Sequence, residues 1–83
     1  MKIRYFAWVR ERIGKAEEDV APPADVLTTT DLLAWLKGRG DEYAWALERA
    51  DVIRVAIDKV HAAPDTPLAD AREVALFPPM TGG

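Results

Sequence analysis

The last apolar run of the chain is Val74-Ala75-Leu76-Phe77, and Pro78-Pro79 follow it directly. Every position of the run is apolar, which is typical of a central strand that is covered on both faces of a sheet. Proline has no backbone N–H to donate to a neighbouring strand, so strand pairing is expected to end at Pro78. The run therefore predicts a sheet with this strand near its middle, and the rest of the chain must supply the neighbouring strands.

The N-terminal segment is the first candidate neighbour. Met1–Val9 reads as a strand with Ile3, Tyr5 and Ala7 on one face and Phe6 on the other. Its basic and aromatic residues alternate with the apolar ones, so this segment also lacks the continuous apolar core of a signal peptide. We expect it to lie beside the last strand.

Two weaker elements are expected after this strand. Val9–Ile13 predicts a helical turn that Gly14 stops, and Ala16–Ala21 predicts a short strand. Within that strand the acidic run Glu17-Glu18-Asp19 is expected to be a solvated edge, because adjacent strand residues point to opposite faces.

The clearest helix begins at Thr28. With Thr28 as N-cap, Asp31 occupies the third helical position, where its carboxylate can accept hydrogen bonds from free backbone amides. Gly38 or Gly40 should end this helix. A shorter helix is expected over residues 41–49, and Trp35 and Trp45 are expected to pack in the core or half-buried at its edge.

A hairpin is expected after the helices. Val52–Ile57 alternates with β-branched residues, Asp58-Lys59 makes a tight turn without the glycine that is common there, and Val60–Ala62 forms the returning strand. The order strand, weak strand, helix, short helix, hairpin, strand predicts an α+β fold of the β-grasp type. In it one helix packs on one face of a mixed sheet.

Length and composition limit the classes of protein to consider. The 83 residues are enough for one domain, expected over residues 1–79, and the net charge of −3 argues against nucleic-acid binding. No apolar run is long enough to cross a membrane. The chain has no cysteine, which excludes disulfides and thiolate chemistry, and we expect a cytoplasmic protein.

The sequence contains almost no catalytic constellation. His61 is its single histidine and is expected to be a surface or core residue, and no set of residues has metal-ligand spacing. We therefore expect a protein that is not an enzyme on its own and binds no metal.

The remaining candidate is the terminal segment, residues 80–83, which is expected to project as an extended, flexible tail. Four extended residues reach about 13 Å, enough to enter the active-site cleft of a partner. Gly82 and Gly83 have no Cβ atoms and can pass through a narrow channel. The α-carboxylate of Gly83 would become electrophilic if a partner converted it to an acyl-adenylate with ATP, and no side chain of this protein would be needed.

Two stretches, Glu73–Gly83 (EVALFPPMTGG) and Phe6–Gly14 (FAWVRERIG), resemble the small, sulfur-carrying subunit of molybdopterin synthase in order and spacing. The resemblance covers nearly the whole chain. It implies the ubiquitin-like β-grasp fold, in agreement with the pattern of elements.

The resemblance also implies a mechanism. An adenylating enzyme related to ubiquitin-activating enzymes would use ATP to activate Gly83, which would then carry sulfur as a C-terminal thiocarboxylate. The tail would enter the large subunit, in a heterotetramer of two small and two large subunits, and give its sulfur to cyclic pyranopterin monophosphate. The catalytic side chains would belong to the partners, and this chain would hold no cofactor tightly.

By the same resemblance, residues of this chain acquire expected roles. Gly83 bears the thiocarboxylate, and Gly82 with Thr81 before it threads the channel. Phe6 and Phe77 belong to a partner-binding face, with Val60 alongside, and Arg10 meets the activating enzyme. The competing interpretation is that both phenylalanines fill the core under the helix.

Other functions share the same tail. A carrier for thiamin thiazole synthesis or tRNA thiolation, or a ubiquitin-like modifier, would also use Gly82-Gly83. The run from Leu76 to Pro79 favours molybdopterin synthase. A plain interaction domain with an incidental tail is the alternative from a different class.

Overall fold

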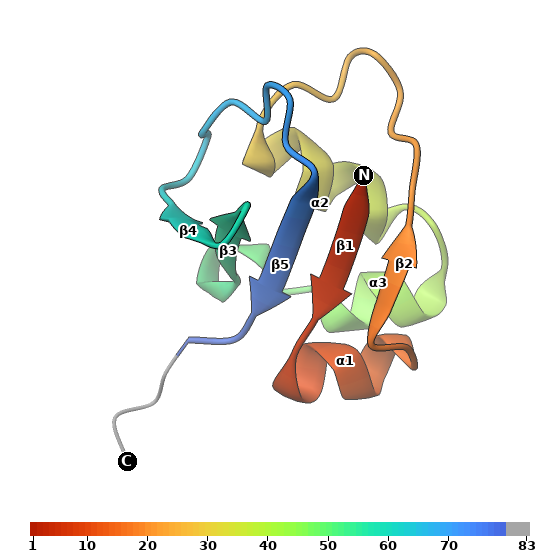
Figure 1. Cartoon of the computed structure of the whole chain (residues 1–83). Coiled ribbons are helices and arrows are strands. Elements are labelled where there is room, and N and C mark those ends of the chain that lie inside the picture. The colour runs from red at the N-terminus through yellow and green to blue at the C-terminus, as the bar shows by residue number, and fades with distance from the viewer. Residues whose placement is uncertain (80–83) are drawn as a thin grey trace.

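Five strands form one mixed sheet in the order β2-β1-β5-β3-β4 in a computed structural model that describes residues 1–79 (Figure 1). The last strand runs parallel to the first and antiparallel to the third. The predicted β-grasp arrangement is confirmed, whereas the predicted tail, residues 80–83, lies outside the described residues. The elements are β1 (Lys2–Tyr5), α1 (Ala7–Ile13), β2 (Glu17–Asp19), α2 (Thr29–Lys37), α3 (Asp41–Ala46), the 3₁₀ helix η1 (Ala50–Val52), β3 (Arg54–Ile57), β4 (Val60–Ala62) and β5 (Glu73–Phe77).

Strand β5 is central, as predicted, but only one of its faces is buried. Val74 and Leu76 are fully buried on the face that α2 covers, while Ala75 and Phe77 on the other face are half-buried. The prediction that both faces are covered was therefore wrong, because helices pack on one side of the sheet only. Apolar residues remain on the uncovered side, and they belong to the candidate site described below.

Strand β1 is shorter than predicted, since the chain turns into α1 directly after Phe6. Ala7 has φ 53°, in the left-handed region, and this sharp turn ends the extended backbone. Val9 and Ile13, four residues apart, then bury the same face of α1, and Gly14 caps the helix with φ 90°. Residues 7–9, which were predicted to belong to the strand, therefore form the first turn of α1 instead.

The predicted capping box of α2 is confirmed. The Asp31 amide donates to Thr28 Oγ1 at 3.2 Å, and the Thr28 amide donates to Asp31 Oδ2 at 3.2 Å. The helix ends before Gly38, and Leu32 and Leu36 on its inner face are fully buried. These two leucines form the centre of the core beneath β1 and β5.

Trp35 and Trp45 differ in how far their side chains are buried. Trp35 is half-buried as predicted, but Trp45 is 54% exposed, so the prediction of a packed or half-buried Trp45 was wrong. The guanidinium carbon of Arg12 lies 4.7 Å from the ring centroids of both Trp8 and Trp45, and Arg12 also donates to the Trp45 carbonyl at 3.1 Å. These cation–π contacts connect α1 to α3.

β2 is an edge strand as predicted, and Glu17 and Asp19 are exposed on it, but the Glu18 side chain is not solvated. Its side chain is only 13% exposed, and its Oε2 accepts hydrogen bonds from the hydroxyls of Tyr5 at 2.7 Å and Tyr43 at 2.6 Å. Lys15 and Arg39 approach its Oε1 at 3.4 and 3.2 Å. The carboxylate therefore joins β2 to β1 and α3.

The protonation of this cluster follows from its contacts. Burial opposes ionisation of Glu18, but the hydrogen bonds from Tyr43 and Tyr5 and the charge of Arg39 outweigh it and lower its pKa. Burial and the hydrogen bond to Glu18 raise the pKa of the Tyr5 hydroxyl, so Tyr5 stays a donor.

Because the pKa of Glu18 is lowered in the folded state, its charge stabilises the fold above the usual glutamate pKa of about 4.3. That stabilisation is lost as pH falls through the folded-state value. We expect Glu18→Gln to lower the free energy of unfolding at pH 7 by about 1–3 kcal/mol, and to lose less stability than the native chain between pH 5 and pH 2. Urea titrations at each pH measure both quantities, with Glu11→Gln as the control for losing an exposed carboxylate. Equal pH slopes for the native chain and Glu18→Gln would contradict the assignment.

The β3–β4 turn is made without glycine, as the sequence indicates. Asp58 and Lys59 have φ 48° and 71°, so two residues with side chains occupy the left-handed region. Asp58 is anchored there, because its Oδ1 accepts from the amides of Arg72 at 3.0 Å and Glu73 at 2.9 Å. Among the described residues Lys59 has no hydrogen bond or ion pair of that kind.

The difference between these two turn residues can be measured. Lys59→Gly should raise the free energy of unfolding by about 0.5–1 kcal/mol, since relief of left-handed strain exceeds the entropic cost of glycine. Asp58→Gly should lower it by about 1–2 kcal/mol, because two amides lose their acceptor. Thermal and urea unfolding of both variants test this, and a destabilised Lys59→Gly would show that the turn is not strained.

Candidate functional site

The face of the sheet opposite α2 is the candidate site, and we call it the open face. Strand register places ten side chains on it, since paired residues point the same way and alternate residues point to opposite faces. They are Lys2, Arg4, Glu17, Asp19, Arg54, Ala56, His61, Glu73, Ala75 and Phe77. Small alanines occupy its middle, so a partner surface can approach the backbone of β3 and β5 closely.

Two phenylalanines mark one end of the open face. Phe6 is 38% exposed and has an extended backbone, which continues the alternation of β1, and its amide donates to the Leu76 carbonyl at 3.1 Å. This places Phe6 next to Phe77, on the face away from Ile3, as predicted. The competing interpretation, in which both rings fill the core under the helix, is wrong.

Cations surround this aromatic end. The guanidinium carbon of Arg4 lies 5.4 Å from the Phe6 ring centroid, and Arg4 also lies 3.9 Å from a Glu73 carboxylate oxygen. Arg54 pairs with Phe77 across the strands, and the His61 ring lies 6.2 Å from the Phe77 ring. The aromatic end of the open face is therefore bordered by Arg4 and Arg54, whereas its other end carries both charges, since Lys2 lies opposite Glu73 and Asp19. The aromatic end suits a partner with an apolar patch beside acidic residues.

The predicted site residues separate into three groups. Arg10 is exposed on α1, which lies at the carboxyl ends of β1 and β5 close to the aromatic end of the open face (Figure 1). Val60 is 68% exposed, but it pairs with Ile57, whose side chain points to the covered face. The prediction that Val60 lies alongside the phenylalanines was therefore wrong. Thr81, Gly82 and Gly83 lie outside the described residues.

Sequence reasoning missed Arg4, Arg54 and the two alanines of the open face. They were detectable in principle, since the hairpin register puts Ala56 opposite Ala75 and Arg54 opposite Phe77. That register depends on which residues of β3 face the core, and the alternation of Val55 and Ile57 contains this information.

Other kinds of site find little support in the described part of the chain. Within residues 1–79 no three His, Cys, Asp or Glu side chains gather as a metal site would require. In the same range no helix is long and apolar enough to cross a bilayer.

The sequence matches a known family and known proteins over nearly its whole length. The sequence pattern of the ThiS family matches residues 3–83. The chain belongs to the ThiS family. It is 39% identical over 83 residues to the molybdopterin synthase sulfur carrier subunit of Escherichia coli (strain K12), covering 100% of this chain and 99% of the relative. With the subunit of the same name from Haemophilus influenzae the identity is 31%, at the same coverage.

Two solved structures have the same fold as this chain. SAMP1 from Haloferax volcanii superposes with a TM-score of 0.73 and 32% identity, over 100% of this chain and 98% of that one. A putative molybdopterin converting factor, subunit 1, from Pyrococcus furiosus gives a TM-score of 0.72 and 25% identity, over 94% of each chain. This family member thus has the fold that its pattern of elements predicts.

The exposure of Phe6 has a measurable consequence for stability. Phe6→Ala should lower the free energy of unfolding by about 1 kcal/mol or less, because the ring is partly in solvent already. Leu76→Ala should lower it by about 2–5 kcal/mol, since Leu76 is fully buried. Urea unfolding of the two variants makes the comparison. A loss for Phe6→Ala as large as that for Leu76→Ala would mean that Phe6 supports the core.

Proposed function

We propose that this chain is the sulfur carrier subunit of a molybdopterin synthase and that its C-terminal Gly83 carries the sulfur. The main support is that Phe77, at the exit of the central strand, lies on an open apolar face immediately before the terminal segment. A protein that docks on this face would lie beside Phe77, three residues before the terminal segment begins. The full-length identity to subunits named molybdopterin synthase sulfur carrier supports the same assignment.

The chemistry starts with a poor electrophile. The Gly83 carboxylate is ionised at neutral pH, so it must be activated before sulfur can be added. An oxygen of the carboxylate attacks the α-phosphorus of ATP and pyrophosphate leaves. A sulfur nucleophile then attacks the acyl carbon and AMP leaves, which yields a thiocarboxylate on Gly83.

The thiocarboxylate then delivers its sulfur within the large subunit. The acceptor is cyclic pyranopterin monophosphate, and water cleaves the acyl–sulfur bond as the sulfur is transferred, which restores the Gly83 carboxylate. Two such thiocarboxylates are used for the two sulfurs of one product. Gly82 and Thr81 thread the channel, since a glycine leaves the backbone narrow. The chain itself supplies no catalytic side chain in this scheme, and ATP is used by the activating enzyme rather than held by the carrier.

Residues of the open face and of α1 would contact the partner proteins. Phe6 and Phe77 would contact the large subunit, with Arg4 and Arg54 pairing to acids at its border. Arg10 on α1 would meet an adenylating enzyme of the ubiquitin-activating type. Two carriers and two large subunits would form the synthase, in the cytoplasm.

A second candidate is a protein modifier that uses the same tail. The similarity to SAMP1 of Haloferax volcanii favours it, and carriers for thiamin thiazole synthesis or tRNA thiolation share the same terminal chemistry. These alternatives differ in the acceptor that receives the activated Gly83.

The intact mass of the protein tests the proposal. After incubation with the activating enzyme, ATP and a sulfur donor, the chain should gain the mass difference between sulfur and oxygen. The product should then convert the pterin precursor when the large subunit is added. Deletion of Gly82-Gly83 should abolish both reactions and leave the free energy of unfolding unchanged within about 0.5 kcal/mol, since a terminal segment contributes little burial.

Each outcome separates the candidates. No mass gain, under conditions in which a control carrier reacts, would end the sulfur-carrier assignment. A mass gain without pterin conversion would favour another thiolation pathway. Covalent attachment of the chain to lysines of other proteins would favour the modifier.

A further inference from the structure

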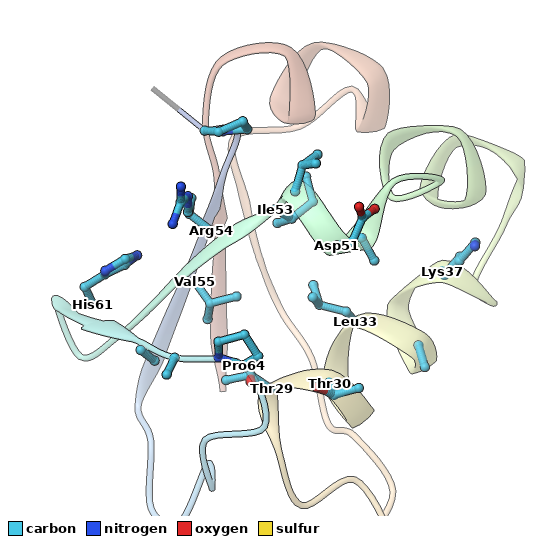
Figure 2. A pocket seen from close by; sticks show the side chains of 16 residues that line it. Thr29, Thr30, Leu33, Lys37, Asp51, Ile53, Arg54, Val55, His61 and Pro64 are labelled. Atoms are coloured by element: carbon cyan, nitrogen blue, oxygen red, sulfur yellow. The ribbon is translucent and has the colours of Figure 1, made fainter. Parts of the chain in front are cut away.

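A groove of about 960 Å³ lies between α2 and the β3–β4 hairpin, on the side of the sheet that the open face does not use (Figure 2). Leu33 on α2 and Val55 on β3 project into it from opposite walls. Arg54 and His61, which belong to the open face by register, are also among the residues that line the groove. Of the lining residues, only Arg54 has a part in the proposed function.

The floor of the groove is apolar and already ordered. Leu33, Ile53 and Val55 are 9%, 8% and 6% exposed, so their packing in the core fixes the shape of the floor. Helix α2 has nine residues and is roughly 13 Å long at 1.5 Å per residue. At about 3.3 Å per extended residue, that length accommodates about four residues of an extended peptide.

The charge of the groove is opposite to that of the whole chain. Lys37 on α2 and Arg54 on β3 are exposed cations at its rim, while the protein has a net charge of −3. The one acidic residue of the lining, Asp51, already pairs with Arg49 at 3.2 Å. The local field therefore favours an occupant with carboxylates.

A buried hydroxyl supplies a second observation. Thr29 lines the groove, is 2% exposed, and its Oγ1 has no hydrogen-bond partner among residues 1–79. Buried polar atoms are nearly always hydrogen-bonded, and leaving one unpaired costs about 1–3 kcal/mol. Threonine adopts two χ1 rotamers in a helix, so this hydroxyl can turn to donate to a carbonyl of an occupant.

The edge of the sheet provides backbone groups beside the groove. Strand β4 is the last strand of the sheet, and within the described part of the chain it pairs with β3 alone. Its residues carry no acidic side chain, and His61 and Ala62 line the groove. A segment that leaves the groove alongside β4 can therefore hydrogen-bond to an open strand edge.

We propose that this groove binds an extended acidic peptide segment of a partner protein. Two aliphatic side chains of the segment lie on Leu33 and Val55, its carboxylates pair with Lys37 and with Arg54 at the border of the open face, and one of its carbonyls accepts from Thr29. The sulfur chemistry on Gly83 does not require this binding. Because Arg54 also belongs to the open face, a segment in the groove and a partner on the open face compete for its guanidinium.

The test uses a fluorescein-labelled peptide, Glu-Val-Ile-Val-Asp-Asp, and fluorescence polarisation with the full chain. Saturable binding is expected with a Kd of about 10–100 μM. Ala34→Glu places a carboxylate over the floor at an exposed helical position and should abolish binding. Lys37→Glu should weaken it at least about tenfold. Lys59→Glu, the same charge change on an exposed turn outside the groove, should leave the Kd unchanged.

Three results would overturn the proposal. The first is no saturation at about 1 mM peptide, a limit well above the expected Kd. The second is equal binding by a peptide with lysine at its three acidic positions. The third is binding only after residues 80–83 are deleted, which would make the chain's own terminal segment the occupant. Intact-mass assays on Ala34→Glu keep this separate from the sulfur-carrier function, because that variant should still accept sulfur on Gly83.

Discussion

The position of β5 between β1 and β3 is the constraint on which the rest of the structure depends. Val74 and Leu76 must face the leucines of α2, and strand alternation then forces Ala75 and Phe77 to the opposite side. Helices pack on one face only, so burial of the first pair leaves the second pair uncovered. The core and the open face are therefore both consequences of a single strand.

Local chemistry made part of this fold predictable. The capping box of Thr28 and Asp31 is a contact within four residues, so the sequence contains all the information that it needs. The turn at Asp58-Lys59 and the two hairpin strands are local in the same sense. The phenylalanines of the open face were predicted because alternation along a strand is also a short-range rule.

The failures concern side-chain positions that depend on how strands and helices pair and pack, and residue type alone does not set these positions. Glu18 appears solvated until Tyr5 and Tyr43 come from β1 and α3 to donate to it. Val60 appears to belong with Phe77 until the register with Ile57 puts it on the other face. β1 ends early because the chain turns into α1, which buries Val9 and Ile13 in the core. The apolar and aromatic residues at positions 5–9 are also typical of a strand, so composition alone did not predict this turn.

The two edges of the sheet differ in a way that limits how copies of this protein can associate. β2 is one edge, and its three residues, Glu17 to Asp19, are all acidic, whereas β4 at the other edge has none. Edge-to-edge growth of a fibre needs two edges that accept a strand, because every added copy must offer a site for the next. Acidic side chains along β2 repel another acidic strand, so charge opposes pairing of two copies through their β2 edges, whereas β4 carries no acid to repel a strand. Strand pairing is therefore directed to β4, and a dimer formed through β4 of both copies would present two acidic edges that repel further dimers.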